Sequence, residues 1–331
     1  MKFSFYSWLL LAAFCFPHAA GAADVGEDTD GILSVVWEND IFGNTDQNYT
    51  NGIRISWLSS EAGMPNWANW AADNLLPVAS NGNKRTSLAV GQSMFTPENL
   101  ATTLPQPTDR PYAGWLYGSM GVVSDTGTTL DNVMLTLGVV GPSSQAEETQ
   151  KWVHSIVGSP DPKGWDNQLR DEPGIVLTYE RKWRGLYQFS PFGFGFDATP
   201  HVGVNLGNIF TDASTGLTFR LGRDLPADYG PPRIRPSVPG SDFFIPTQDF
   251  GWYLFAGVEG RAVARNIFLD GNSFRESAHV EKENFVGGLQ AGGAITYGPT
   301  RISYTHVLST REYETQVKPE QFGVISVSWR F

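Results

Sequence analysis

The densest group of polar side chains in the sequence lies near its start. Its members are Glu38, Asn39, Asp40, Asn44, Asp46, Asn48 and the run Tyr49-Thr50-Asn51-Gly52. Carboxylate and amide oxygens are the ligands that hard cations such as Ca²⁺ prefer, although the spacing does not match an EF-hand loop. Asn, Asp and Gly are also the usual turn formers. The cluster therefore predicts either a cation site or an ordinary solvated hairpin.

Two further polar clusters follow along the chain. One is Thr108-Asp109-Arg110-Pro111-Tyr112-Ala113-Gly114, which we interpret as a turn with an ion pair rather than as a catalytic site. The other runs from residue 145 to residue 157, where Gln150 and His154 are four residues apart. Residues at this spacing share one face of a helix. We therefore expect a short helix that presents both side chains together.

His154 is the best candidate for a general base among the five histidines. His18 lies in the amino-terminal segment, and His201, His279 and His306 lie on predicted strands or a turn with no carboxylate and amide cluster nearby. An unperturbed histidine has a pKa near 6.5, so it is largely neutral at pH 7 and can accept a proton. The alternative is a structural or merely exposed loop histidine.

The elements that must position these residues show the alternation of β-strands. Residues 325–331 alternate apolar and polar side chains up to the terminal Phe331, which is typical of a strand with one apolar face. Similar segments recur, and with further candidates near 86–94, 114–123, 174–183, 189–205 and 284–297 they add up to about 12 strands. Charged residues such as Arg54, Arg220, Glu259 and Arg261 on the other face suit the lumen of a barrel. We predict an all-β, single-chain, antiparallel transmembrane β-barrel with a short helix between strands 5 and 6.

The two ends and the composition agree with an exported barrel. Lys2, the apolar run 8–16 and the small residues 19–22 are typical of a signal peptide, so we assign 1–22 to the signal and 23–331 to the barrel. Cys15, the only cysteine, falls within that signal. The net charge of −11 argues against a nucleic-acid partner. Beyond the signal, no stretch approaches the roughly 18 apolar residues of a spanning helix.

Strand parity and topology place the three clusters relative to the barrel. By alternation, Asp40 and Thr50 fall on the lumen side with Gly52 and Arg54, whereas Asn39 has the lipid-side parity and needs a bend or strand end. If the first strand rises from the periplasm, the connections between strands 1–2, 3–4 and 5–6 emerge at the same outer rim. The natural substrate at that rim is lipopolysaccharide.

The ordered set of motifs resembles the lipid A 3'-O-deacylase family. The resemblance rests on Trp37-Glu38-Asn39-Asp40, Tyr49-Thr50-Asn51-Gly52, Asp109-Arg110-Pro111-Tyr112-Ala113-Gly114, and His154 with Gly164-Trp165-Asp166-Asn167-Gln168, and it covers nearly the whole chain after the signal. It implies a 12-stranded outer-membrane barrel that hydrolyses the 3'-linked acyloxyacyl ester of lipid A with Ca²⁺. Members of the family therefore set the expectation for fold, substrate and cofactor.

The resemblance also implies site residues, which match only in part. It places the metal ligands at Asn39 and Asp40, the catalytic histidine at His154, and functional positions at Thr50 and Gln150. A glutamate of the family falls on Pro160, and its loop lysine falls near Thr102. The carboxylates available as replacements are Asp161, Asp166 and Glu147, and Arg110 is an available positive charge.

These observations lead to one reading and its rivals. We expect an outer-membrane monomer whose site faces the outer leaflet, where His154 activates water and a cation at Asp40 and Asn39 stabilises the oxyanion. Thr50 and Gln150 would position substrate or water. No Gly-x-Ser-x-Gly elbow for a covalent route is present. The non-catalytic rivals are a narrow channel, or a barrel that binds lipopolysaccharide or a partner through residues 60–84 and 223–250.

Overall fold

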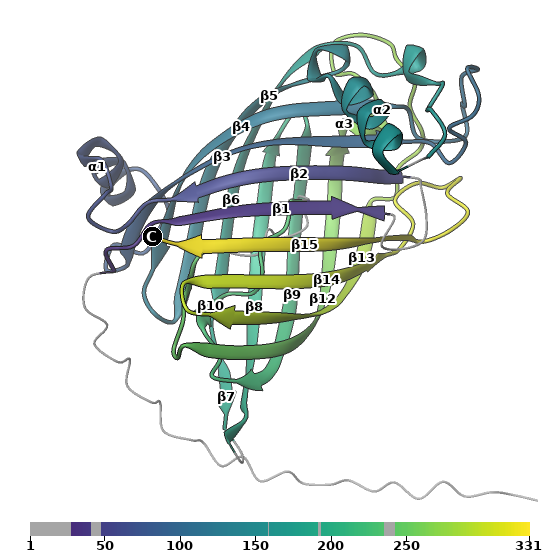
Figure 1. Cartoon of the computed structure of the whole chain (residues 1–331). Helices are drawn as coiled ribbons and strands as arrows, with labels where there is room; N and C mark the ends of the chain where they lie inside the picture. The colour runs from purple at the N-terminus through teal and green to yellow at the C-terminus, as the bar shows by residue number, and fades with distance from the viewer. Residues whose placement is uncertain (1–27, 41–47, 158, 191–192, 235–241) are drawn as a thin grey trace, which may run out of the picture.

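The computed structural model is a closed antiparallel β-barrel, described over residues 28–40, 48–157, 159–190, 193–234 and 242–331 (Figure 1). Within those ranges, the twelve long strands are β1 (Ile32–Asn39), β2 (Asn48–Leu58), β3 (Asn83–Thr96), β4 (Ala113–Asp125), β5 (Thr129–Val140), β6 (Glu172–Trp183), β8 (Gly195–Gly207), β9 (Phe210–Arg223), β12 (Phe250–Asn266), β13 (Phe285–Tyr297), β14 (Thr300–Ser309) and β15 (Glu320–Arg330). These twelve strands confirm the predicted fold. Short strands β7 (Tyr187–Phe189), β10 (Ala227–Asp228) and β11 (Phe244–Ile245) complete the set.

Each long strand pairs with the next long strand along the chain, including β1 with β2 and β6 with β8. One further pairing, between β1 and β15, closes the ring. At the seam, the main-chain N–H of Gly31 donates to Phe331 O at 2.9 Å, and that of Phe331 donates to Gly31 O at 3.0 Å. The two ends of the described chain therefore lie side by side.

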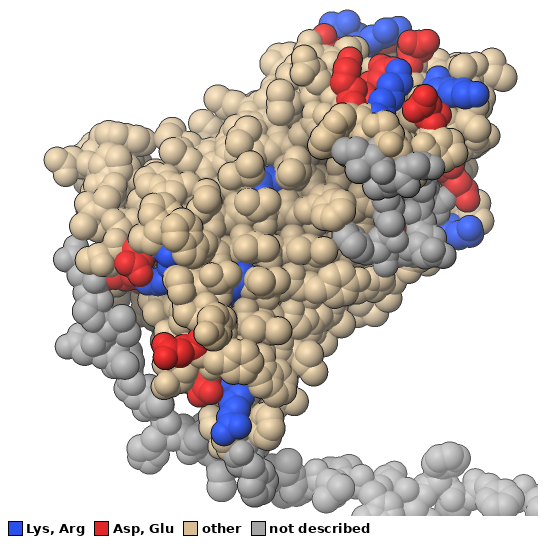
Figure 2. Space-filling view, viewed as in Figure 1, with Lys and Arg blue, Asp and Glu red and all other residues tan. Residues whose placement is uncertain are grey.

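The outer face of the barrel is apolar, as alternation predicts. On β1, Leu33, Val35 and Trp37 are exposed, whereas Ser34 and Val36 between them are fully buried. Figure 2 shows a broad band of this surface almost without charged side chains, with charges gathered toward the two ends. No helix in the described part of the chain is long and apolar enough to cross a membrane.

The predicted lumen residues do face inward, and they take part in ion pairs. Arg220 pairs with Asp197 and Asp228, and Arg261 pairs with Glu312. Toward one end of the barrel, an apolar layer crosses the lumen and includes Tyr49, Phe95, Trp115, Phe210, Phe268 and Phe322. Phe268 belongs to the short helix α3 (Ile267–Asp270), and its ring stacks on Phe95 at 4.0 Å.

The Pro-rich connection between β9 and β12 folds into the lumen rather than away from the barrel. The main-chain N–H of Ile234 donates to Glu38 Oε1 at 2.8 Å, and Arg54 Nη2 on β2 donates to Asp242 Oδ2 at 2.6 Å. The sequence had suggested residues 223–250 as a loop that binds lipopolysaccharide or a partner. Its residues 226–234 and 242–245 instead lie inside the barrel, an arrangement that also counts against the channel alternative.

Two helices mark the two ends of the barrel. Helix α1 (Asn66–Asn74), in the connection between β2 and β3, marks the α1 end, where both ends of the described chain also lie. Helix α2 (Ala146–Val157), between β5 and β6, marks the α2 end and confirms the predicted helix. Short 3-10 helices η2 (Pro142–Ser144) and η3 (Trp165–Asn167) flank α2.

Candidate active site

The three polar clusters lie at the α2 end of the barrel. The first cluster joins β1 to β2, the second precedes β4, and the third connects β5 to β6. Asp40 directly follows β1 and is 1% exposed. Asn44 and Asp46 of the first cluster lie outside the described residues. Positions far apart in sequence are therefore gathered at one rim, as the predicted topology requires.

Helix α2 and its approach segment pack against the outer face of the barrel wall. Gly114 shares its strand face with the outward-pointing Leu116, and a Cβ atom at Gly114 would collide with Ser144 and Ala146. On the neighbouring strand, Gln92 Nε2 donates to the main-chain oxygen of Ser144 at 2.7 Å. The helix consequently covers the lipid-side surface of β3 and β4 and not the lumen.

One face of α2 presents the predicted histidine and glutamine to the wall. Ala146, Gln150 and His154 follow one another at a spacing of four residues and are 1%, 2% and 5% exposed. This confirms that Gln150 and His154 share a helix face. On the flank beside this face, Lys151 Nζ donates to Glu147 Oε1 at 2.5 Å, and this hydrogen bond raises the pKa of Lys151.

The ring of His154 is oriented by a main-chain carbonyl. Its Nδ1 lies 2.6 Å from the oxygen of Pro160. A carbonyl oxygen only accepts hydrogen bonds, so Nδ1 carries the hydrogen and the lone pair of the neutral ring is at Nε2. Among the described residues no carboxylate takes this position, because Asp161 and Asp166 are exposed and Glu147 pairs with a lysine of its own helix. Pro160 thus contributes its backbone to the orientation of His154.

The side chain of Gln150 is held by an indole. Trp165 Nε1 donates to Gln150 Oε1 at 2.7 Å, and both side chains are buried. Because an indole N–H can only donate, the amide oxygen faces Trp165 and the amide nitrogen points elsewhere. That nitrogen is buried and has no hydrogen-bond partner among the described residues. Gln150 therefore offers a fixed N–H donor one helical turn from His154.

Thr50 does not point into the lumen, which corrects the parity prediction. A bulge in the β2–β3 pairing falls between Tyr49 and Asn51. The ring of Tyr49 enters the lumen layer, 5.3 Å from Phe95, while the Thr50 hydroxyl lies 2.6 Å from that of Thr96. Because Thr96 follows the lumen-facing Phe95, it lies on the opposite face of the wall. The extra residue of the bulge thus turns Thr50 toward the side that α2 covers.

Asn39 ends β1 with the lipid-side parity, as predicted. Its Nδ2 donates to Asn51 Oδ1 at 3.2 Å, and Trp37 Nε1 donates to the same oxygen at 2.8 Å. Asn51 is opposite Met94 in the β2–β3 register, and Met94 packs in one cluster with Trp165. Asn39 is therefore connected, through Asn51 and Met94, to the residues that pack beneath α2.

Arg110 lies apart from this site, and Thr102 lies at its edge. The guanidinium of Arg110 sits 5.2 Å above the ring of Phe95 and pairs with Glu312, so it belongs to the lumen side. Thr102 carries no positive charge, but the backbone of Lys163 runs beside it and donates to Leu100 O at 2.8 Å. Trp165 and the carbonyl of Pro160 are the contributors that residue types alone did not single out.

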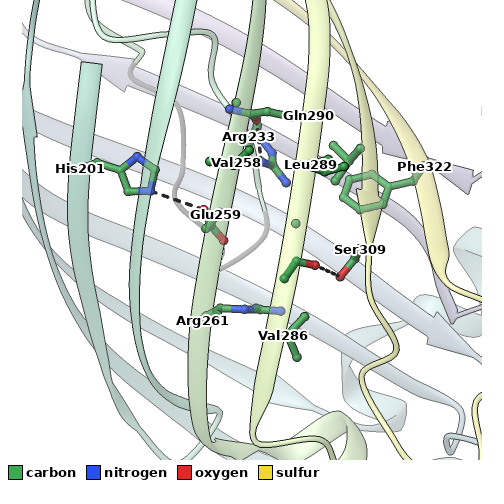
Figure 3. Close-up of a pocket in the computed structure, with 14 residues that line it drawn as sticks. His201, Arg233, Val258, Glu259, Arg261, Val286, Leu289, Gln290, Ser309 and Phe322 are labelled. Carbon is green, nitrogen blue, oxygen red and sulfur yellow. Dashed lines mark hydrogen bonds and ion pairs between the residues drawn. The ribbon is translucent and has the colours of Figure 1, made fainter. Parts of the chain in front are cut away.

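The barrel also contains a histidine and carboxylate pair within a lumen cavity (Figure 3). His201 Nε2 lies 3.7 Å from Glu259 Oε2, and the amide of Gln290 lines the same cavity, which corrects the expectation that no carboxylate and amide cluster lies near this histidine. Arg233, from the segment inside the lumen, donates to Gln290 Oε1 at 2.8 Å across the same cavity. The pair is enclosed by the wall and the inserted segment, so it lies apart from the lipid-side surface where α2 packs.

The donors available to a cation are oxygen atoms. The described residues contain no group of three or more His, Cys, Asp or Glu side chains that could hold a metal ion. At the end of β1, however, the carboxylate of Asp40 and the amide oxygen of Asn39 are adjacent in sequence and buried. Their chemistry fits a hard cation such as Ca²⁺, which completes its shell with main-chain oxygens, water or substrate.

Comparisons with known proteins agree with the fold. The model of the family described as outer membrane protein LpxR matches residues 6–331. The structure of LpxR from Salmonella typhimurium is similar, with a TM-score of 0.72 and 19% identity over 91% of this chain and 100% of that one. The β-domain of the Bordetella autotransporter BrkA is more distant, with a TM-score of 0.44 and 11% identity over 92% and 100% of the two chains. No curated protein matches the chain in sequence.

Proposed function

Because this chain belongs to the LpxR family of outer-membrane proteins, we propose that it is an esterase that hydrolyses the 3'-linked acyloxyacyl group of lipid A. The observation that carries the proposal is the orientation of His154. Its Nδ1–H is held by Pro160 O, which leaves Nε2 as the basic atom on the wall-facing side of α2. An oriented, neutral imidazole is the arrangement that a general base requires.

In the proposed reaction, water attacks the carbonyl carbon of the ester. His154 Nε2 takes one proton from this water, while Pro160 O remains bonded to Nδ1–H and stabilises the imidazolium that forms. When the tetrahedral intermediate collapses, the C–O bond to the alkoxide breaks and His154 returns the proton to that oxygen. The products are a free carboxylic acid and a hydroxyl group on the remaining lipid, so atoms and charges balance.

Gln150 and Thr50 assist the same reaction through hydrogen bonds from fixed positions. The amide nitrogen of Gln150, whose oxygen is fixed by Trp165, donates a hydrogen bond to the developing oxyanion. The hydroxyl of Thr50, beside Thr96, orients water or substrate. Burial of these donors favours the reaction, because hydrogen bonds to charge are stronger where water is excluded.

Asp40 and Asn39 are the residues that would hold Ca²⁺. When bound there, a divalent cation supplies Lewis-acid polarisation of the ester carbonyl. The location of the site on the lipid-side surface suits a substrate that stays in the bilayer. We further propose that the α2 end faces the outer leaflet and that the protein acts as a monomer.

Mass spectrometry of lipid A tests this function. Lipid A would be analysed from cells that express the wild-type protein, His154→Ala or the matched control His279→Ala, with and without added Ca²⁺. His279 is an exposed histidine in the connection between β12 and β13 at the same end of the barrel. We expect loss of a 3'-linked acyloxyacyl group with the wild type and the control, and a rate lower by about 10²- to 10⁴-fold with His154→Ala. Unchanged lipid A from a correctly folded wild-type barrel would refute the proposal.

A further inference from the structure

An apolar groove runs along the lipid-facing surface of strands β2 to β5. It is an open hollow of about 500 Å³, lined mainly by Ile55, Leu88, Val90, Gly118, Met120 and Leu137. We call it the outer groove. Its lining is mostly aliphatic, with the thioether of Met120 and the indole of Trp57, and it includes no charged side chain.

The floor of the outer groove is Gly118. In the strand register, Gly118 lies between Val90 of β3 and Leu137 of β5, whose side chains are 53% and 52% exposed. A Cβ atom at Gly118 would meet only Ala89 O, at 3.9 Å. The backbone therefore does not require glycine here, and the missing side chain leaves a gap between two protruding aliphatic residues.

The groove lies below the candidate active site on the same surface. Gly114, which α2 covers, is four residues before Gly118 on β4, and Met94, which packs with Trp165, is four residues after Val90 on β3. At about 3.3 Å per residue, both strands give a separation of about 13 Å. The groove thus continues from the covered site toward the α1 end, along the direction that a lipid chain takes within the bilayer.

We propose that the outer groove binds the distal part of the acyl chain whose ester lies at His154 and Gln150. The proposal rests on the proposed ester hydrolysis, and it adds a subsite for one linear hydrocarbon chain. Only the far methylenes of a long chain reach a floor that lies about 13 Å from the site. The groove consequently selects for chain length, because a short chain leaves it unfilled.

Filling the floor tests the subsite by activity. The chain would carry Gly118→Leu or the matched control Gly293→Leu, which adds the same side chain to the lipid-facing surface of β13. Each is assayed with two ester substrates that differ only in the length of the cleaved acyl chain. We expect Gly118→Leu to lower kcat/KM for the long chain about tenfold or more, at the low end of what one methylene gives in an apolar pocket. Turnover of the short chain, and both rates of the control, stay within about twofold of wild type.

Photolabelling separates this inference from the proposed reaction. His154→Ala barrels, with and without Gly118→Leu, are reconstituted with lipid A whose acyl chain ends in a diazirine, and labelled peptides are mapped by mass spectrometry. We expect label concentrated on β2 to β5 and lost in the Gly118→Leu background. Label spread evenly around the wall, or unchanged by Gly118→Leu, overturns the subsite even if the wild type hydrolyses lipid A. Concentrated label with a wild type that hydrolyses nothing keeps the subsite and refutes the reaction.

Discussion

Replacing Trp165 by Phe removes one hydrogen-bond donor from the candidate site and changes little else. The indole N–H of Trp165 donates to Gln150 Oε1 at 2.7 Å in a fully buried contact. A phenyl ring keeps most of the packing against Tyr112, whose ring centroid is 5.0 Å from that of Trp165. The substitution therefore tests whether the orientation of the Gln150 amide matters for catalysis.

The expected magnitude follows from the buried amide oxygen. Leaving a buried acceptor without its partner costs about 1–3 kcal/mol. Rotation of the amide relieves that cost only by turning its oxygen toward the place where the N–H of Gln150 is needed. If this cost of about 1–3 kcal/mol raises the free energy of the transition state in full, kcat/KM falls by about fivefold to 150-fold. The conversion uses about 1.4 kcal/mol per factor of ten.

The assay compares initial rates of ester hydrolysis for the wild type, Trp165→Phe and Trp152→Phe. Trp152 is on the same connection, but its side chain is 65% exposed and points away from the wall. Barrel folding is checked by the shift in electrophoretic mobility between unheated and heated samples. A Trp165→Phe enzyme that is folded and as fast as the Trp152→Phe control would show that a fixed Gln150 amide contributes nothing to the reaction.

Three further outcomes are expected. Asp40→Asn raises the Ca²⁺ concentration needed for half-maximal hydrolysis at least tenfold, because it removes the charged oxygen ligand; a Ca²⁺ titration of the rate with unchanged half-saturation would contradict this. Gly114→Leu abolishes hydrolysis but leaves the barrel folded, because the added side chain displaces Ala146 and the start of α2; retained activity would argue against the helix placement. Arg220→Met lowers the free energy of unfolding by about 3–5 kcal/mol, because the buried Asp197 loses its ion-pair partner and the buried Asp228 is left with Arg301, whereas the exposed Arg223→Met has little effect. Urea unfolding monitored by gel mobility measures that difference, and equal effects of the two variants would exclude the buried ion pairs as its source.

The barrel itself could be predicted from the sequence because successive side chains of each strand face lipid and lumen in turn, so apolar and polar residues alternate. All twelve long strands coincide with segments that alternate apolar and polar residues, and the polar side carries the arginines that form lumen ion pairs. The prediction that Thr50 faces the lumen was wrong, because a single bulge residue reverses which side chains face the lumen. The residue types around the bulge do not indicate its presence. The lumen position of residues 226–234 and 242–245 also escaped prediction, since proline content indicates a connection but not its direction.

The candidate site was predictable in its residues but not in its contacts. The spacing of Gln150 and His154 sufficed to place them on one helix face. By contrast, the partner that orients His154 is a main-chain carbonyl, which every residue possesses, so no residue type signals it. The neighbourhood of His201 and Glu259 was missed for a related reason, because it depends on the strand register, which places both residues beside Gly216 of the intervening strand β9.

The seam between β1 and β15 has a consequence for biogenesis. The first strand finds its last hydrogen-bonding partner only in residues 320–331, at the opposite end of the chain. Until that segment has been synthesised and has arrived, the sheet keeps two open edges, which are surfaces prone to wrong pairing. The ring therefore closes only once strand β15 is available to pair with β1. A carrier that shields both edges during transit to the membrane would prevent wrong pairing in that interval. The arrival of strand β15 is the event that allows the barrel to close.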